Sequence, residues 1–103
     1  MEFSRLSERA LEIRKHYEAF EEKQFGRSWT LEEISLGFMG DVGDLAKLIL
    51  AHEGVRTIPD AKGKLEHELA DCLWSLMVIA NKCEIDLENA FTSTMDDLER
   101  SLT

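Results

Sequence analysis

Apolar residues recur at steps of three and four along most of the chain, which is the spacing of an amphipathic helix. The first such stripe consists of Phe3, Leu6, Ala10, Ile13, Tyr17 and Phe20. It predicts a helix that runs to about Lys23, and the same period over residues 31–52, 61–82 and 87–102 predicts three more. Since no segment carries a strand signal, the sequence predicts an all-α domain, a four-helix bundle.

Capping residues mark where these helices begin and end. Thr30 with Glu33 three residues later has the form of a capping box, which predicts that the second helix begins there. Gly54 and Pro59 mark the loop that follows it. Asp86 is the predicted N-cap of the last helix. The second and third helices are therefore predicted to form a hairpin around this loop.

Composition limits the class of protein further. A chain of 103 residues, 44% apolar and 32% charged, predicts a single domain over residues 1–103. The longest apolar run is five residues, at 76–80, whereas a membrane span needs about 18 or more. The start of the chain has no basic segment followed by an apolar one, so we expect a cytoplasmic protein without a membrane partner.

The charge excludes some partners and favours a cation. With 12 Lys and Arg against 21 Asp and Glu, the net charge is −9, and the chain has no basic run. Such a protein repels nucleic-acid polymers and anionic lipid surfaces. To handle a phosphate compound it would need a divalent cation, because carboxylates bind Mg²⁺ and Mg²⁺ binds phosphate oxygens.

The third predicted helix is apolar on nearly every side. Between positions 69 and 80 its only polar side chains are those of Asp71 and Ser75. The other helices of one short chain can hardly cover it, which favours a homodimer or homotetramer with this helix in the shared core. The alternative is a monomer whose long loop covers Trp74 and Met77.

Two acidic pairs at a spacing of three stand out from the others because of their apolar or glycine-rich surroundings. They are Asp41 with Asp44 on the second helix, and Glu68 with Asp71 on the third. Positions 41 and 71 share the midpoint 56 with positions 44 and 68, and this midpoint falls in the loop. In an antiparallel hairpin the four carboxylates therefore lie at one level, and they could hold one or two Mg²⁺ or Mn²⁺ ions.

A structural explanation of these acids stays open at this point. Asp44 could pair with Lys47, and Glu68 with Lys64, as ordinary ion pairs on a helix surface. Gly37 and Gly40 fall on the same side of the second helix as the acids. Bare backbone there leaves room either for a ligand or for a closely packed helix.

These residues also carry a family resemblance. Residues 40–46 (GDVGDLA) resemble the E-V-G-E-L-A stretch of the MazG-like nucleoside triphosphate pyrophosphohydrolases, and residues 68–74 (ELADCLW) resemble their E-L-A-D-V-L-W stretch. Residues 85–91 (IDLENAF) are similar to the start of that family's last helix. The resemblance covers about residues 29–100, and its second motif is the more specific one.

The resemblance implies an all-α oligomer that hydrolyses a nucleoside triphosphate to the monophosphate and pyrophosphate, a reaction suited to clearing unwanted nucleotides from the pool. It implies that Asp41, Asp44, Glu68 and Asp71 hold Mg²⁺ or Mn²⁺ and form the catalytic set. Trp29 matches an aromatic residue that some members use near the base. In place of the family's own phosphate ligands, Lys82 and Arg100 are the candidate phosphate contacts. The alternative for each is a solvated cation at the end of its helix.

Departures from the family pattern keep other functions open. Members usually have Glu at positions 41 and 44, and Asp reaches about 1.5 Å less far toward a metal. The K-M-x-x-N motif of the last helix is replaced by residues 94–98 (TMDDL), which lack both the Lys and the Asn. The chain could therefore be a non-catalytic relative that binds nucleotide or metal, or an oligomerisation module whose acids are solvated.

Other chemistries lack the residues that they need. A di-iron helical bundle requires Glu-x-x-His pairs, and the positions three before the histidines hold Ile13, Ile49 and Lys64. Cys72 and Cys83 are eleven residues apart on one predicted helix, too far for a disulfide and without zinc-site spacing. No Ser/His/Asp or Cys/His arrangement and no phosphate-binding glycine loop is present.

Overall fold

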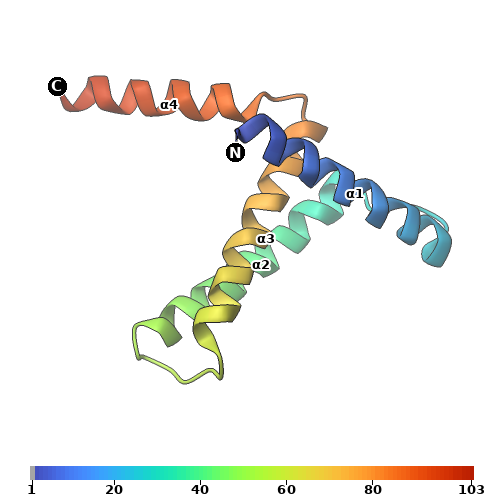
Figure 1. Ribbon diagram of the computed structural model, residues 1–103, viewed down its shortest axis with the longest axis horizontal. Coiled ribbons are helices and arrows are strands. Elements are labelled where there is room, and N and C mark those ends of the chain that lie inside the picture. The colour runs from blue at the N-terminus through green and yellow to red at the C-terminus, as the bar shows by residue number, and fades with distance from the viewer. Residues whose placement is uncertain (1) are drawn as a thin grey trace. The chain divides into compact units, whose positions relative to one another are not determined.

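Residues 2–103 form four α-helices. The computed structural model describes residues 2–103 and contains α1 (Phe3–Phe25), α2 (Leu31–His52), α3 (Ala61–Lys82) and α4 (Leu87–Leu102) (Figure 1). No strand occurs within residues 2–103, which confirms the predicted all-α class. None of the helices in that range is both long enough and apolar enough to cross a membrane. The first helix continues two residues past the predicted end and stops at Gly26, whose φ of 79° is left-handed.

The predicted caps are present at the helix starts. The Thr30 hydroxyl accepts a hydrogen bond from the Glu33 backbone N–H at 3.2 Å, and Glu33 Oε1 accepts one from the Thr30 N–H at 3.0 Å. The Asp86 carboxylate accepts from the Asn89 N–H at 3.1 Å. Both caps are confirmed. The box fixes where α2 begins, and through the helical repeat it fixes the direction in which the acids of α2 point.

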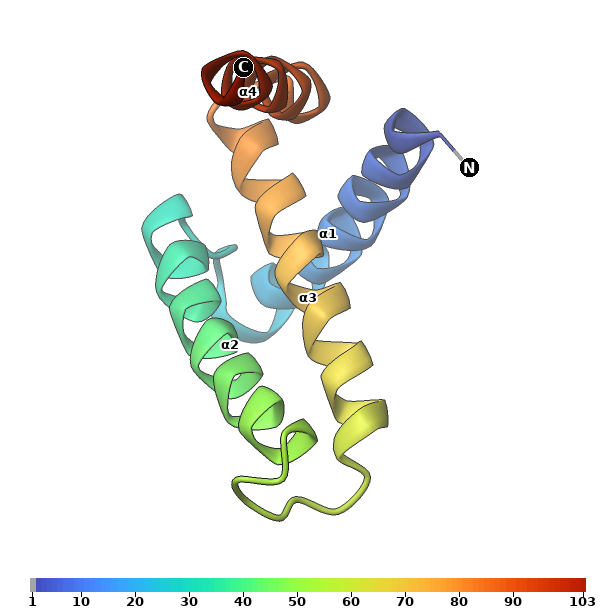
Figure 2. The ribbon, with the colours of Figure 1, turned by 90° about the vertical axis from the view of Figure 1, so that its left-hand side faces the viewer.

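The helices belong to two compact units. One unit contains the residues up to Ser28 together with Met77–Thr103, and the other contains Trp29–Leu76, so that α3 contributes to both. In the second unit α2 and the first part of α3 run antiparallel and are joined by the loop 53–60 (Figures 1 and 2). This unit is the predicted hairpin. Whether the whole chain behaves as a single domain stays a prediction.

Small and medium-sized side chains form the buried part of each unit. In the first unit Ala10 of α1 is buried, as are Met77, Val78 and Ala80 of α3, and in the hairpin unit Ile34, Leu48 and Cys72 are buried. The cysteines are free: Cys72 is buried and Cys83 is exposed.

Many large apolar side chains remain exposed. On α3 they are Leu69, Leu73 and Leu76, and on α4 they are Phe91, Met95, Leu98 and Leu102. Leu102 alone keeps 87% of its surface accessible. On each of these helices the exposed apolar residues recur at steps of three and four, and a helix face of this kind is typical of a surface that another chain covers. The predicted oligomeric core is compatible with these faces and stays a prediction.

Candidate metal and nucleotide site

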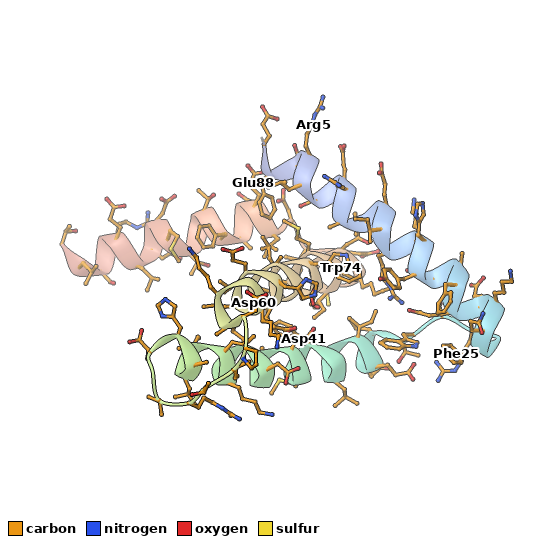
Figure 3. The ribbon with its side chains drawn as sticks, turned by 60° about the horizontal axis from the view of Figure 1, so that its bottom comes forward. Arg5, Phe25, Asp41, Asp60, Trp74 and Glu88 are labelled. Carbon is orange, nitrogen blue, oxygen red and sulfur yellow. The ribbon has the colours of Figure 1, made fainter. Side chains whose placement is uncertain are left out.

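Three of the four predicted acids come together between the arms of the hairpin. One carboxylate oxygen from each of Asp41, Asp44 and Glu68 lies within 4.8 Å of the other two. Figure 3 shows Asp41 on the side of α2 that faces α3. The first two acids lie one turn apart on α2, and α3 brings Glu68 opposite them. This is the convergence that their shared distance from the loop predicts.

The neighbouring lysines do not neutralise these acids. Among the described residues, neither the Asp44–Lys47 nor the Glu68–Lys64 contact falls within 4.0 Å, although both spacings allow an ion pair. The interpretation of the acids as ordinary surface ion pairs is therefore wrong for these two. Within the range described, the carboxylates of Asp41, Asp44 and Glu68 lie close together, and Lys47 and Lys64 do not contact them.

Glu68 has an oxygen that no hydrogen bond satisfies. Its Oε2 is buried, and in the part of the chain that the structure describes it has no hydrogen-bond partner. A buried carboxylate oxygen without a donor is costly, and such a group usually has an unseen water or ion as partner. Three oxygen ligands at close range suit a hard divalent cation such as Mg²⁺ or Mn²⁺. The cluster therefore fits the metal that the resemblance implies.

Burial and mutual repulsion act on the ionisation of these acids. Burial, followed by the charges of Asp71 and Asp44, raises the pKa of Asp41 above its ordinary value. Burial, followed by the charges of Asp41, Asp71 and Asp44, raises the pKa of Glu68. The charge of His67 opposes both shifts. The ionised cluster is thus destabilised in the protein alone, and a bound cation would relieve it.

Asp71 stands at the edge of the cluster. It is outside the group of three mutually close oxygens, and its Oδ2 lies 3.2 Å from His67 Nε2, one turn earlier on α3. Its charge nevertheless acts on Asp41 and Glu68, so it is close to both. His67 contacts one oxygen of Asp71, which leaves the other oxygen for a ligand.

The glycines of α2 leave open space rather than a close helix contact. A side-chain carbon built on Gly37, Gly40 or Gly43 would have nothing within 4 Å among the residues that are described. The interpretation that these glycines let a helix pack closely is therefore wrong within this chain. All three glycines are exposed, and none of them lines the groove beside the carboxylates.

Cys72 borders the cluster and is chemically quiet. Its thiol is buried, and burial, then the charges of Asp41, Glu68 and Asp71, raises its pKa. A thiol held in its neutral form is neither a strong nucleophile nor a metal ligand. The site therefore depends on oxygen ligands.

The predicted substrate contacts have other surroundings. Trp29 opens the hairpin unit just before the Thr30 cap and is 44% exposed. Lys82 and Arg100 belong to the other unit, where Lys82 Nζ lies 3.7 Å from Glu18 and Arg100 pairs with Asp97. Both cations already have acidic partners. Their contact with phosphates stays a prediction, as does the role of Trp29.

A groove next to the cluster contains residues that the sequence patterns did not single out as functional. Its volume is about 440 Å³, and Asp44 and Glu68 form one part of its wall. Lys47, Lys64 and His67 line the rest together with Ile58 of the loop. In the sequence the two lysines are explained equally well as ion-pair partners of the acids. Only the missing contacts reveal them as free cations beside the carboxylates.

Comparison with known proteins agrees with this geometry. A family model described as the MazG nucleotide pyrophosphohydrolase domain matches residues 29–101. The chain belongs to the MazG nucleotide pyrophosphohydrolase family. The matched residues include all four acids of the hairpin formed by α2 and α3. The match confirms the resemblance to the MazG family inferred from residues 40–46 and 68–74.

Two curated relatives are similar over most of this MazG chain. They are dCTP pyrophosphatase 1 of Rattus norvegicus, 33% identical over 88 residues, and dCTP pyrophosphatase 1 of Mus musculus, 31% identical over 88 residues. Each alignment covers 81% of this chain and 52% of the relative. The chain thus spans about half the length of the curated relatives that it matches.

Proposed function

We propose that this MazG chain hydrolyses a nucleoside triphosphate to the nucleoside monophosphate and pyrophosphate, with Mg²⁺ or Mn²⁺ as cofactor. The observation that carries the proposal is the group of three carboxylate oxygens within 4.8 Å without a cation from the described chain. Family membership adds the reaction class. Removal of unwanted nucleotides from the pool would be its role in the cell.

The position of each acid indicates its proposed role in binding the cation. Asp41, Asp44 and Glu68 would hold the cation, and Asp71, contacted by His67, would add a fourth carboxylate at the edge. When bound, the cation supplies charge that offsets the triphosphate and the leaving pyrophosphate. Asp41 and Asp44 reach less far than Glu would, so their oxygens would have to meet Glu68 around the cation; their distance of at most 4.8 Å from the Glu68 oxygen supports this.

The chemical step is a displacement at the α-phosphorus. A water oxygen forms a bond to that phosphorus, and the bond from the phosphorus to the oxygen that bridges to the β-phosphorus breaks. The electron pair of that bond leaves with pyrophosphate, and a carboxylate of the cluster accepts the proton of the water.

The substrate proposal follows the relatives. Both are named dCTP pyrophosphatase, so dCTP is the first triphosphate to test, together with other canonical and modified ribo- and deoxyribonucleotides. Trp29, at the start of the hairpin unit, is the proposed contact for the base, since an exposed indole offers a stacking surface.

A homodimer or homotetramer is part of the proposal. The exposed apolar residues of α3 and α4 support it, because a soluble monomer rarely exposes so many large side chains in a row. Size-exclusion chromatography with light scattering gives the mass directly. A mass of 11.8 kDa at micromolar concentration would contradict it.

The deciding experiment measures pyrophosphate release with Mg²⁺ or Mn²⁺ from wild type, Asp71→Asn and the control Glu66→Gln, whose acid is exposed on the same helix. We expect release by wild type and the control, and a loss of at least about 100-fold in Asp71→Asn with the helical signal unchanged. Mg²⁺ should also raise the midpoint of thermal unfolding of wild type.

The other outcomes are equally informative. Metal-dependent stabilisation without release from any nucleotide would identify a binding relative whose aspartates no longer support turnover. Neither stabilisation nor release would leave an oligomerisation module. Unfolding of Asp71→Asn would show that this acid is structural.

A further inference from the structure

The groove beside the carboxylate cluster has an order along the hairpin. The first level, farthest from the loop, carries Asp41 and Asp71, and the next carries Asp44 and Glu68, both with midpoint 56. Lys47 and Lys64 have the midpoint 55.5, so they form a third level one turn nearer to the loop. Two levels of acids are thus followed by one level of lysines, contributed by both helices.

These lysines are free to bind a ligand. Both are exposed, both line the groove, and neither forms an ion pair within the described chain, although each has an acid at a favourable helical spacing. A lysine usually turns toward such an acid when the acid has no better partner. Two unpaired ammonium groups on facing helices produce a local positive charge in a protein whose net charge is −9.

The end of the groove at the loop is acidic again. Asp60 lines it, with a backbone φ of 51°. Its carboxylate lies over the first turn of α3, where Oδ2 would be 2.7 Å from a side-chain carbon added at Gly63. A side chain at position 63 would require the Asp60 carboxylate to move, and that carboxylate already occupies the space beside the helix start. An anion in the groove would meet the lysines and not this helix end.

We propose that Lys47 and Lys64 bind the β- and γ-phosphates of the substrate, so that the triphosphate runs from the carboxylate cluster toward the loop 53–60. This inference rests on the proposed function, because it assigns the two ends of that same site. The α-phosphate lies at the cluster, the pyrophosphate group lies between the lysines, and the nucleoside points toward the start of α2. These lysines supply the charge that the last helix lacks.

The test separates the two ends of the substrate by using its two products. Calorimetric titration with inorganic pyrophosphate and, separately, with deoxycytidine monophosphate, both in excess Mg²⁺, is carried out on wild type, Lys47→Met and Lys64→Met. Lys62→Met is the matched control, since it removes the same charge from α3 at an exposed position outside the groove. Circular dichroism checks that each variant keeps its helices.

We expect each groove variant to lose about tenfold or more in affinity for pyrophosphate, the scale of one charge-assisted contact. Monophosphate affinity should change less than twofold, and Lys62→Met should match wild type for both products. In turnover, the KM for the triphosphate should rise more than kcat falls. Lys47→Gln and Lys64→Gln should repeat the loss, which excludes an effect of the methionine.

Contrary results are distinct. Unchanged pyrophosphate affinity, or an equal loss for both products, would overturn the assignment of the lysines while leaving the proposed function intact if wild type still releases pyrophosphate. Pyrophosphate binding that weakens equally in Lys62→Met would show only a general charge effect, and it would also overturn the assignment. Failure of the proposed function itself appears separately, as absent release and absent Mg²⁺ stabilisation in wild type.

Discussion

Each of the two compact units brings acids of its helices into a half-buried cluster, and the two clusters differ in one respect. In the first unit, Arg14 donates to both oxygens of Glu21 at 2.9 and 2.7 Å, and Glu18 lies 3.6 Å from Arg14 Nε and 3.7 Å from Lys82 Nζ. In the hairpin unit the acids face each other, and the nearby lysines lie apart from them. One cluster is neutralised by the chain and the other is not.

The difference shows how a structural cluster and a ligand site can be told apart. Over residues 2–103, Arg14 Nε is also buried without a hydrogen bond, but the charge of Arg14 is offset by Glu21 and Glu18. A buried ion pair whose charges offset each other holds its element in place and offers little to a ligand. A group of acids that repel one another is kept only if something outside the chain repays the cost, since the protein alone would be more stable without it. Three predictions test this contrast, beginning with the largest effect.

Glu21→Gln should destabilise the first unit strongly. It removes the carboxylate that accepts from both terminal nitrogens of the buried Arg14 guanidinium and leaves only Glu18 of the described residues, 3.6 Å from Nε. Breaking a buried pair of this kind costs about 3–5 kcal/mol. Urea unfolding followed by circular dichroism measures the free energy of unfolding, with the exposed Glu22→Gln as control. Replacing both partners with apolar residues, Arg14→Met with Glu21→Leu, should recover most of the loss.

A loss below about 1 kcal/mol in Glu21→Gln would contradict the contrast, because it would show that this pair carries no more energy than a surface pair. Absence of recovery in the double variant would mean that the two residues also hold partners that apolar side chains cannot replace.

Glu68→Gln should have the opposite sign in the metal-free protein. The substitution removes one of the repelling charges, and the new amide could donate a hydrogen bond to a neighbouring acid. We therefore expect the free energy of unfolding to rise by about 1 kcal/mol at neutral pH.

The pKa values of Asp41 and Glu68 are raised in the folded state. At pH values just above the ordinary pKa values of these acids, the folded state therefore binds more protons than the unfolded state. Stability of the metal-free wild type should therefore fall as pH rises through that window.

The measurement is urea unfolding from about pH 4 to pH 7 in a chelator, for wild type, Glu68→Gln and Glu66→Gln. The fall with pH should be smaller in Glu68→Gln and unchanged in Glu66→Gln. Added Mg²⁺ should reverse the order, since it stabilises wild type and not Glu68→Gln. A Glu68→Gln protein that is less stable than wild type without metal would show that this acid supports the fold.

Much of this contrast could be predicted from the sequence, because it depends on spacing within helices and across a hairpin. The levels of Asp41, Asp44, Glu68 and Asp71 follow from distance to the loop, and the Thr30 cap follows from local hydrogen bonding. Ion pairing could not be predicted, since a lysine at a favourable spacing still has several rotamers of similar energy. In the part of the chain that is described, Lys47 and Lys64 do not contact the acids at these spacings, whereas Arg14 donates to Glu21 two turns further along α1.

The ion pair between Arg14 and Glu21 is a contact that forms although helical spacing does not predict it. Local spacing rules consider partners three or four residues apart, and these two are seven apart. Burial selects the longer contact, because a guanidinium removed from water needs a carboxylate that accepts two hydrogen bonds. Periodicity alone does not reveal which charges will be buried.

Lys82→Met should have the smallest effect. Its ammonium is 3.7 Å from Glu18, and both side chains keep about a third of their surface, 30% and 33%, in solvent. Such a pair contributes less than about 0.5 kcal/mol to the free energy of unfolding, and salt weakens it further. Urea unfolding at about 0.05 M and about 0.5 M salt measures the free energy that the pair contributes and its dependence on salt, because the Debye length is longer at the lower concentration.

Because the sequence also predicts Lys82 as a phosphate contact, the same variant should be assayed for pyrophosphate affinity. A clear loss of affinity with unchanged stability would move Lys82 from the neutralised cluster to the ligand site, and it would show that a paired cation can serve both.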